Sequence, residues 1–126
     1  MAKSIGHILK KKASLKLNGS LWVECEGESF FGPGPVELLK NIADTGSINK
    51  AAKKMKMSYK KAWKLIHALN EQTSRPVVIV QSGGDHGGGS VITDEAKDLI
   101  TYHVRLRKRF KNFLEKETKG LSRTMK

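Results

Sequence analysis

The sequence predicts an α+β domain in which short strands come first, helices follow, and a β-hairpin leads into a long final helix. Three observations support this prediction. Turn residues separate short alternating runs before residue 32, apolar helical patterns begin at capping residues between residues 35 and 75, and two β-branched runs flank a glycine-rich loop.

The segment before residue 32 is expected to form short strands. In SLKLNGSLWVEC, Asn18-Gly19 separates two alternating runs, and Asn-Gly favours a tight hairpin because both turn positions need a positive φ. A second turn is expected at Glu26-Gly27 before the strand ESFF, and Gly32 to Pro35 ends the strand region.

Helical patterns with start and stop signals occupy residues 35–75. Pro35 suits a first helical turn and Gly46 a helix end, with apolar residues in PVELLKNIAD on one face. Ser47 is the expected N-cap of a second, short helix and Ser58 that of a third, which ends before Pro76. The predicted core positions of these last two helices are Ile48, Ala51, Ala52, Met55, Ala62, Leu65, Ile66 and Leu69.

Two strands and a long helix are expected next. Val77–Val80 and Val91–Thr93 flank the loop QSGGDHGGGS, and a helix begins at Thr93 and runs to about Lys119, where Gly120 is the expected stop. We predict one domain over residues 13–117, including a dimerisation helix over 93–117, with flexible ends at 1–12 and 118–126.

Charge is the strongest compositional signal. The 126-residue chain has a net charge of +12, and residues 47–75 hold eight basic residues and one acid. Such a chain favours a polyanionic partner. One cysteine, no signal-peptide pattern and no apolar run of membrane-spanning length lead us to expect a cytoplasmic protein.

A short helix, a tight turn and a basic helix predict a helix-turn-helix whose second helix reads DNA. Lys60 and Lys64 point away from the core face, with Lys61 and His67 at the flanks. Ser58 and Tyr59 lie at the leading end, and Ser47, Lys50 and Lys53 precede them as phosphate contacts. We expect Trp63 to pack in the core, while the position of Tyr59 stays open.

The glycine-rich loop is best explained as a hairpin tip. A phosphate-binding loop would need a Lys followed by Ser or Thr and then a helix, which this loop lacks. A hairpin after the basic helix completes a winged helix-turn-helix, and the backbone of this wing could approach DNA closely, through Gly84, His86 and Gly87. A loop without a role is the alternative.

No enzymatic, cofactor or metal-binding pattern is evident. The four histidines lack ligand spacing, and no Ser, His and Asp set is suggested by context. We therefore expect a protein that is not an enzyme and needs no cofactor.

The last helix carries an apolar stripe that is too long for a small domain to bury. We therefore expect a homodimer built on this stripe, whose residues are Leu99, His103, Leu106, Phe110 and Phe113.

These motifs together resemble the N-terminal DNA-binding domain of ModE-type molybdenum-dependent transcriptional regulators of prokaryotes. The shared residues are Gly46-Ser47-Ile48, Ala51-Ala52, Ser58-Tyr59-Lys60 with Ala62-Trp63, and Gly83 through Gly89 followed by Ile92-Thr93, within a match over roughly 14–115. The resemblance implies a winged helix like that of LysR-type regulators, binding duplex DNA and dimerising through its last helix.

Two departures from the family pattern bear on this resemblance. Lys56 stands where the family usually has glycine between the two helices; at a positive φ it would cost about 1 kcal/mol. The family's molybdate-binding modules have no counterpart in these residues, so we expect no molybdate binding. The main alternative function is a winged-helix module that docks a protein partner; RNA or membrane-surface binding is less well supported, because stacking aromatics and an opposed apolar face are lacking.

Overall fold

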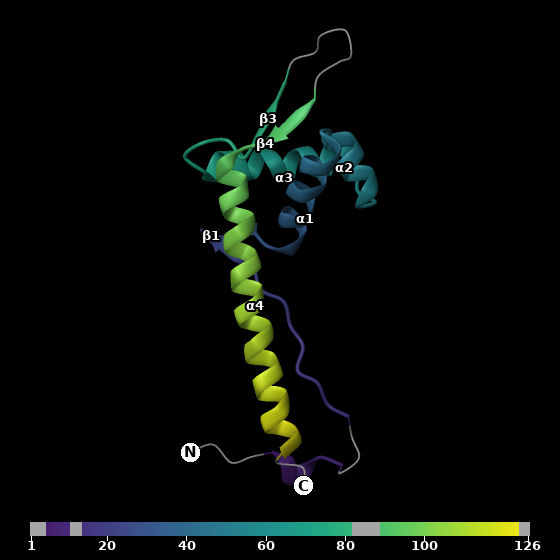
Figure 1. The fold of residues 1–126 in the computed structure, drawn as a ribbon, viewed down its shortest axis with the longest axis vertical. Coiled ribbons are helices and arrows are strands. Elements are labelled where there is room, and N and C mark those ends of the chain that lie inside the picture. Colours follow the sequence, from purple (N-terminus) through teal and green to yellow (C-terminus); the bar gives the residue numbers. More distant parts are fainter. Residues whose placement is uncertain (1–4, 11–13, 82–88, 124–126) are drawn as a thin grey trace. The chain divides into compact units, whose positions relative to one another are not determined.

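A computed structural model describes residues 5–10, 14–81 and 89–123 and confirms an α+β architecture (Figure 1). A short 3₁₀ turn, η1 (Gly6–Ile8), precedes the strands β1 (Val23–Cys25) and β2 (Glu28–Phe31). Helices α1 (Pro33–Thr45), α2 (Ile48–Lys54) and α3 (Tyr59–Gln72) follow, then strands β3 (Val78–Val80) and β4 (Ser90–Ile92), and helix α4 (Asp94–Arg123). The chain divides into two compact units: Leu21–Val104, and Met1–Ser20 with Arg105–Lys126.

The β1–β2 hairpin turns at Glu26-Gly27, as expected. Both residues have a positive φ, 53° and 83°, which is the backbone that a two-residue turn between antiparallel strands requires. Gly supplies this conformation readily, whereas Glu26 adopts it at some cost. The second predicted turn is therefore confirmed.

The hairpin predicted at Asn18-Gly19 is wrong. Residues 14–22 form no strand; the side chain of Asn18 accepts a hydrogen bond from the neighbouring Gly19 N–H, and Leu17 N–H donates to Thr118 Oγ1 at 2.9 Å. A β-carbon at Gly19 would lie 3.1 Å from the Phe110 ring. Within its unit, this segment therefore contacts the C-terminal part of α4, and these contacts replace the strand pairing that its turn signal predicts.

The predicted caps of the three central helices are confirmed. Gly46 ends α1 with φ 69°, and the hydroxyl oxygens of Ser47 and Ser58 accept hydrogen bonds from Lys50 N–H and Lys61 N–H, each at 3.1 Å. These bonds satisfy amides that a helix start leaves without an intrahelical partner. Helix α1 begins at Pro33, two residues earlier than the Pro35 start in the prediction.

The second hairpin is anchored to the helices at its base. Ile79 pairs with Val91 in the antiparallel β3–β4 ladder, and Ser90 N–H donates to Gly46 C=O at 2.8 Å. Directly before the other strand, Val77 N–H donates to the Asn70 side chain of α3 at 2.7 Å. The position of β3 and β4 relative to α1 and α3 is therefore fixed by hydrogen bonds as well as by packing.

The last helix ends later than expected. Thr93 caps its start, accepting from Ala96 N–H at 3.3 Å, as the sequence predicts. Gly120 does not end α4, which continues to Arg123 and so includes part of the predicted tail. A glycine inside a helix costs only about 1 kcal/mol relative to alanine, too little to stop a helix by itself.

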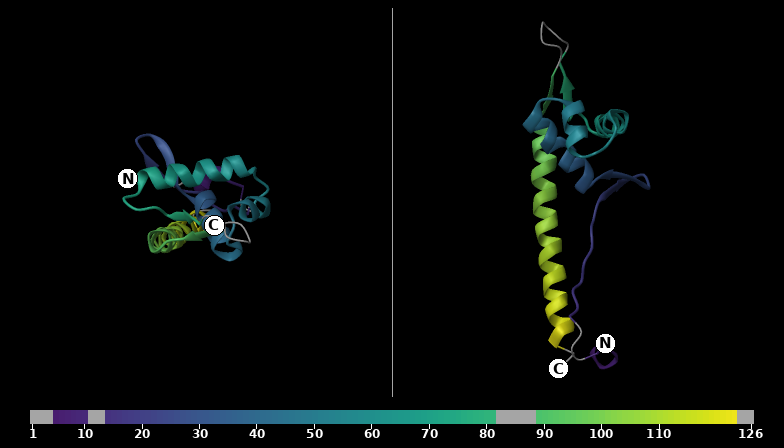
Figure 2. Two further views of the ribbon diagram at one scale, coloured as in Figure 1. Left: turned by 90° about the horizontal axis from the view of Figure 1, so that it is seen from above. Right: turned by 90° about the vertical axis from the view of Figure 1, so that its right-hand side faces the viewer.

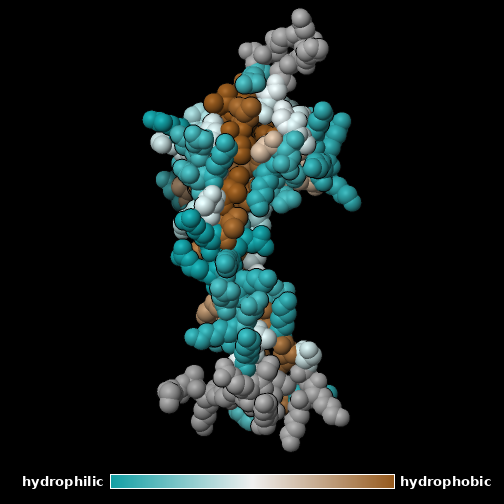
Figure 3. Space-filling view, in the orientation of Figure 1, coloured by the Kyte–Doolittle hydropathy of each residue, from teal (hydrophilic) through white to brown (hydrophobic). Residues whose placement is uncertain are grey.

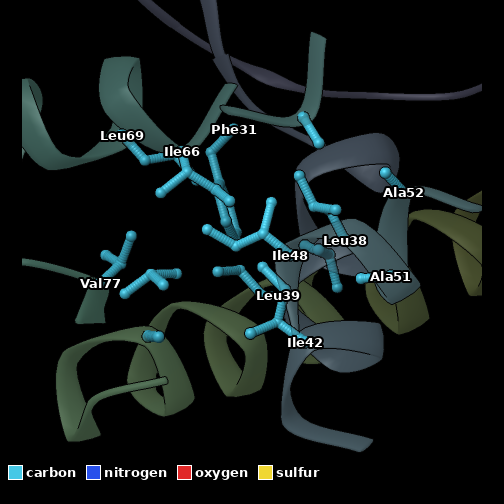
Figure 4. Packing of buried hydrophobic residues seen from close by; sticks show 14 residues of the cluster. Phe31, Leu38, Leu39, Ile42, Ile48, Ala51, Ala52, Ile66, Leu69 and Val77 are labelled. Atoms are coloured by element: carbon cyan, nitrogen blue, oxygen red, sulfur yellow. The ribbon is translucent and has the colours of Figure 1, made fainter. Parts of the chain in front are cut away.

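One apolar core holds the unit Leu21–Val104 together (Figure 4). Phe31 from β2, Leu39 from α1 and Leu69 from α3 are almost fully buried within it. The predicted core face of α3 is confirmed, because Ala62, Ile66 and Leu69 are buried and Leu65 packs against the cluster. Within residues 5–10, 14–81 and 89–123, no helix is both long and apolar enough to span a bilayer.

Candidate nucleic-acid interface

The turn between α2 and α3 sets the angle between these helices. Lys56 N–H donates to Lys53 C=O and Met57 N–H to Ala52 C=O, a Schellman pair of bonds that closes the C-terminus of α2. This motif places its C′ residue in the left-handed region, and Lys56 has φ 56°. The conformation expected from the family comparison is therefore present, with a lysine where glycine would adopt it more readily.

Helix α3 exposes the face opposite the core, and Figure 2 shows the helix at the margin of the domain. Successive residues are rotated by about 100°, which places Lys60 and Lys64 roughly opposite Ala62. Both lysines are exposed, as is Lys61 at the flank. The structure thus leaves the predicted lysine row free to meet a polyanion.

Helix α2 adds further cations and its capping serine. Lys50 and Lys53 are exposed, and Ser47 is half-buried. The hydroxyl oxygens of Ser47 and Ser58 are engaged as caps, so these serines position the two helices whether or not they also contact a ligand. Tyr59, whose position the sequence left open, is 52% exposed.

Trp63 is not part of the core, contrary to expectation. Its side chain is 45% exposed and stacks on His67, with ring centroids 4.8 Å apart and planes 8° apart. His67 Nε2 in turn lies 3.2 Å from Glu71 Oε1. Trp63 follows Ala62 directly, so it is rotated by about 100° from the centre of the buried face, and that offset was the signal that could have placed it outside.

The three residues expected to act at the wing, Gly84, His86 and Gly87, lie outside the described residues. The base of the hairpin is described. There Ile79, Val80 and Val91 are exposed, and Figure 3 shows an apolar stripe over the β3–β4 hairpin and the first turns of α4, with hydrophilic residues on both sides.

The residues expected at a dimer interface differ in their surroundings. His103 is 1% exposed and packs edge-on against Phe31, with centroids 5.7 Å apart. Leu99 packs against the core, Leu106 and Phe110 are half-buried, and Phe113 is 56% exposed. Among the described residues, no group of His, Cys, Asp and Glu side chains could hold a metal ion.

Comparison with known protein families assigns this arrangement of helices and strands to one family. The family description "Bacterial regulatory helix-turn-helix protein, lysR family" matches residues 35–97, which is half of the chain. The match includes most of α1, all of α2 and α3, and the strands β3 and β4. The chain belongs to this lysR family. Its members are regulators rather than enzymes, in agreement with the absence of a catalytic pattern in the sequence.

The individual relatives of this lysR-family chain include ModE proteins. It is 41% identical over 80 residues to "Transcriptional regulator ModE" of Haemophilus influenzae and 38% identical over 80 residues to "DNA-binding transcriptional dual regulator ModE" of Escherichia coli K12; each match covers 64% of this chain. It is also 44% identical over 69 residues, 55% of the chain, to "Molybdenum-pterin-binding protein MopB" of Rhodobacter capsulatus. The matches cover 31%, 30% and 26% of these relatives, so the chain spans less than a third of their length.

Proposed function

We propose that this protein is a transcriptional regulator that binds duplex DNA sequence-specifically, with α3 in the major groove. The observation that carries the proposal is the exposed row of Lys60 and Lys64 on α3, behind a turn that fixes the helix against α2. A major groove admits an α-helix, whose leading side chains reach base edges. The names of the ModE relatives support the same class of function.

The phosphate contacts in this proposal come from α2, from the start of α3 and from the wing. Lys50 and Lys53 are exposed on α2, and Lys61 lies at the flank of α3. Ser47, Ser58 and Tyr59 complete this set, since their hydroxyl groups can donate to phosphate oxygens. Gly84, His86 and Gly87 are proposed as wing contacts, on the sequence pattern alone.

The test compares duplex binding of the wild-type protein and a Lys60→Ala/Lys64→Ala variant across salt concentrations. Phosphate-dominated binding weakens steeply as salt rises. Losing two base-reading contacts should lower specific affinity about 30-fold or more. A Lys40→Ala/Lys97→Ala variant removes the same charge from exposed positions on α1 and α4 and should bind nearly as well as the wild type.

Two results would overturn the proposal. Unchanged affinity of the Lys60→Ala/Lys64→Ala variant would remove α3 as the reading helix. Absence of duplex binding by the wild type at moderate salt would instead favour a module that docks a protein partner.

We further propose that two copies of the chain associate through α4. The later part of the predicted stripe supports this, because Leu106 and Phe110 are half-buried and the exposed Phe113 ring leaves apolar area that a second helix would cover. Leu99 and His103 are already covered by the core of their own chain. Sedimentation equilibrium at tens of micromolar should give a dimer, and Phe113→Lys should shift it towards monomer. Asn112→Lys, at an exposed neighbouring position, is the matched control, and a monomeric wild type would end the proposal.

We also propose that these 126 residues bind DNA without molybdate. The elements that present the lysines are held by caps and by the core, and this arrangement needs no ligand. Added molybdate should therefore leave the affinity for duplex DNA unchanged, and a several-fold change would refute this part.

A further inference from the structure

A short column of exposed side chains runs along one flank of α3. Trp63 and His67 are stacked four residues apart, and Glu71 follows after another four residues. The side chains of His67 and Glu71 are 55% and 65% exposed, so the column stands in solvent on its outer side. No core residue requires the Trp63 indole there, because the buried face of α3 is complete without it.

The column lies beside the lysine row. Lys60 and Lys64 are rotated from Trp63 by about 60° and 100°, so the indole shares the outward half of α3 with them. When these lysines meet a duplex, the apolar indole enters the same groove. Its position on the helix, beside two cations that attract phosphate, argues for nucleic acid rather than a protein surface as its partner.

Base edges in the major groove offer one apolar group. Purines and cytosine present hydrogen-bond donors and acceptors there, whereas thymine also presents its C5-methyl group. We propose that Trp63 is a specificity-determining residue that contacts a thymine C5-methyl, and that His67 and Glu71 are positioning residues that hold the indole plane. This inference rests on the proposed binding of duplex DNA by α3.

The stack on His67 and the contact of His67 with Glu71 explain how the indole is held. A solvent-exposed Trp side chain would otherwise lose rotamer freedom on binding, and this loss would weaken the complex. The near-parallel contact with the His67 ring restricts the indole in advance, and Glu71 Oε1, from the next turn of the helix, lies 3.2 Å from His67 Nε2. Glu71 is the one acid among residues 47–75, and holding His67 accounts for a carboxylate on a face that would otherwise only repel phosphate.

The experiment first selects duplex sites from a random library with the wild-type protein. Each thymine of the selected site is then replaced by uracil, which lacks only the methyl group. At one or two positions uracil should weaken wild-type binding about fourfold, the effect of one buried carbon. Trp63→Ala should bind the thymine and uracil duplexes equally at those positions, so that the two changes are not additive.

Three variants test whether His67 and Glu71 position the indole or only stabilise the fold, and a fourth is the control. His67→Phe keeps a ring in the stack and should retain discrimination between thymine and uracil, whereas His67→Ala and Glu71→Gln should reduce it without changing the unfolding midpoint. Trp22→Ala removes another exposed indole, which does not belong to α3, and should retain full discrimination.

The outcomes distinguish this inference from the function on which it rests. Failure to select any site, with no duplex binding, would overturn the proposed function itself. A selected site at which uracil has no effect, or a Trp63→Ala variant that discriminates as the wild type does, would overturn only the role of Trp63. Loss of discrimination in His67→Phe as well as His67→Ala would refute positioning by the stack.

Discussion

Replacing Lys56 by glycine tests the geometry of the turn between α2 and α3. Lys56 has φ 56°, and the left-handed region costs an L-residue with a β-carbon about 1–2 kcal/mol. Glycine avoids this cost, but its greater conformational freedom in the unfolded chain lowers the free energy of unfolding by about 0.5–1 kcal/mol. We therefore expect Lys56→Gly to raise the free energy of unfolding by about 0.5–1 kcal/mol. Both Schellman hydrogen bonds join main-chain atoms, so the substitution leaves them in place.

The matched control is Lys53→Gly, in the last turn of α2. It removes the same charge from an exposed lysine, but at a helical position, where glycine costs about 0.7–1 kcal/mol. The two variants should thus move stability in opposite directions, separated by about 1.5 kcal/mol.

Urea unfolding followed by circular dichroism measures this difference, and a rise in Tm of about 2–4 °C for Lys56→Gly is the thermal counterpart. If Lys56→Gly were destabilised to the same extent as Lys53→Gly, position 56 would not be left-handed in solution. The account of the turn would then be wrong.

Three further predictions concern single contacts elsewhere in the domain, and the same unfolding measurement tests them. Gly32→Ala should lower the free energy of unfolding by about 1–3 kcal/mol, since the new β-carbon would lie 2.8 Å from Trp22 Cβ. The control is Gly34→Ala, which has open space around it in α1 and should stabilise the protein slightly. Equal effects of the two substitutions would refute the steric argument. Asn70→Ala should cost about 1–3 kcal/mol because it leaves the buried Val77 N–H without its acceptor, whereas Asn70→Asp should cost less. Ser58→Ala should cost about 1 kcal/mol, and Ser58→Asp, which keeps a capping oxygen, should recover most of it.

Local signals predicted the central part of the fold well. Ser47, Gly46 and Ser58 mark helix boundaries through bonds within their own few residues, so neighbouring sequence contains the necessary information. The same holds for the turn at Glu26-Gly27. The helix-turn-helix and its basic outward face can therefore be predicted from local sequence.

Two errors have different causes, distant contacts in one case and the direction of a single side chain in the other. Asn18-Gly19 has the strongest local hairpin signal, yet Thr118 and Phe110, about a hundred residues later, provide the contacts that the segment makes. Trp63 is predicted to pack in the core because it is aromatic and lies near the edge of the apolar face, but its side chain stacks on His67 outside the core. Hydrophobic character indicates a tendency to be buried, whereas the direction of a side chain decides whether partners are available.

The anchoring of the β3–β4 hairpin has a consequence for engineering. The bond from Ser90 N–H to Gly46 C=O joins main-chain atoms, and of the α3 side chains it is Asn70 that bonds to β3. The outward residues of α3 could therefore be replaced together, provided that Asn70 is retained. The domain would then serve as a scaffold on which new reading surfaces are grafted without rebuilding the hairpin beside them.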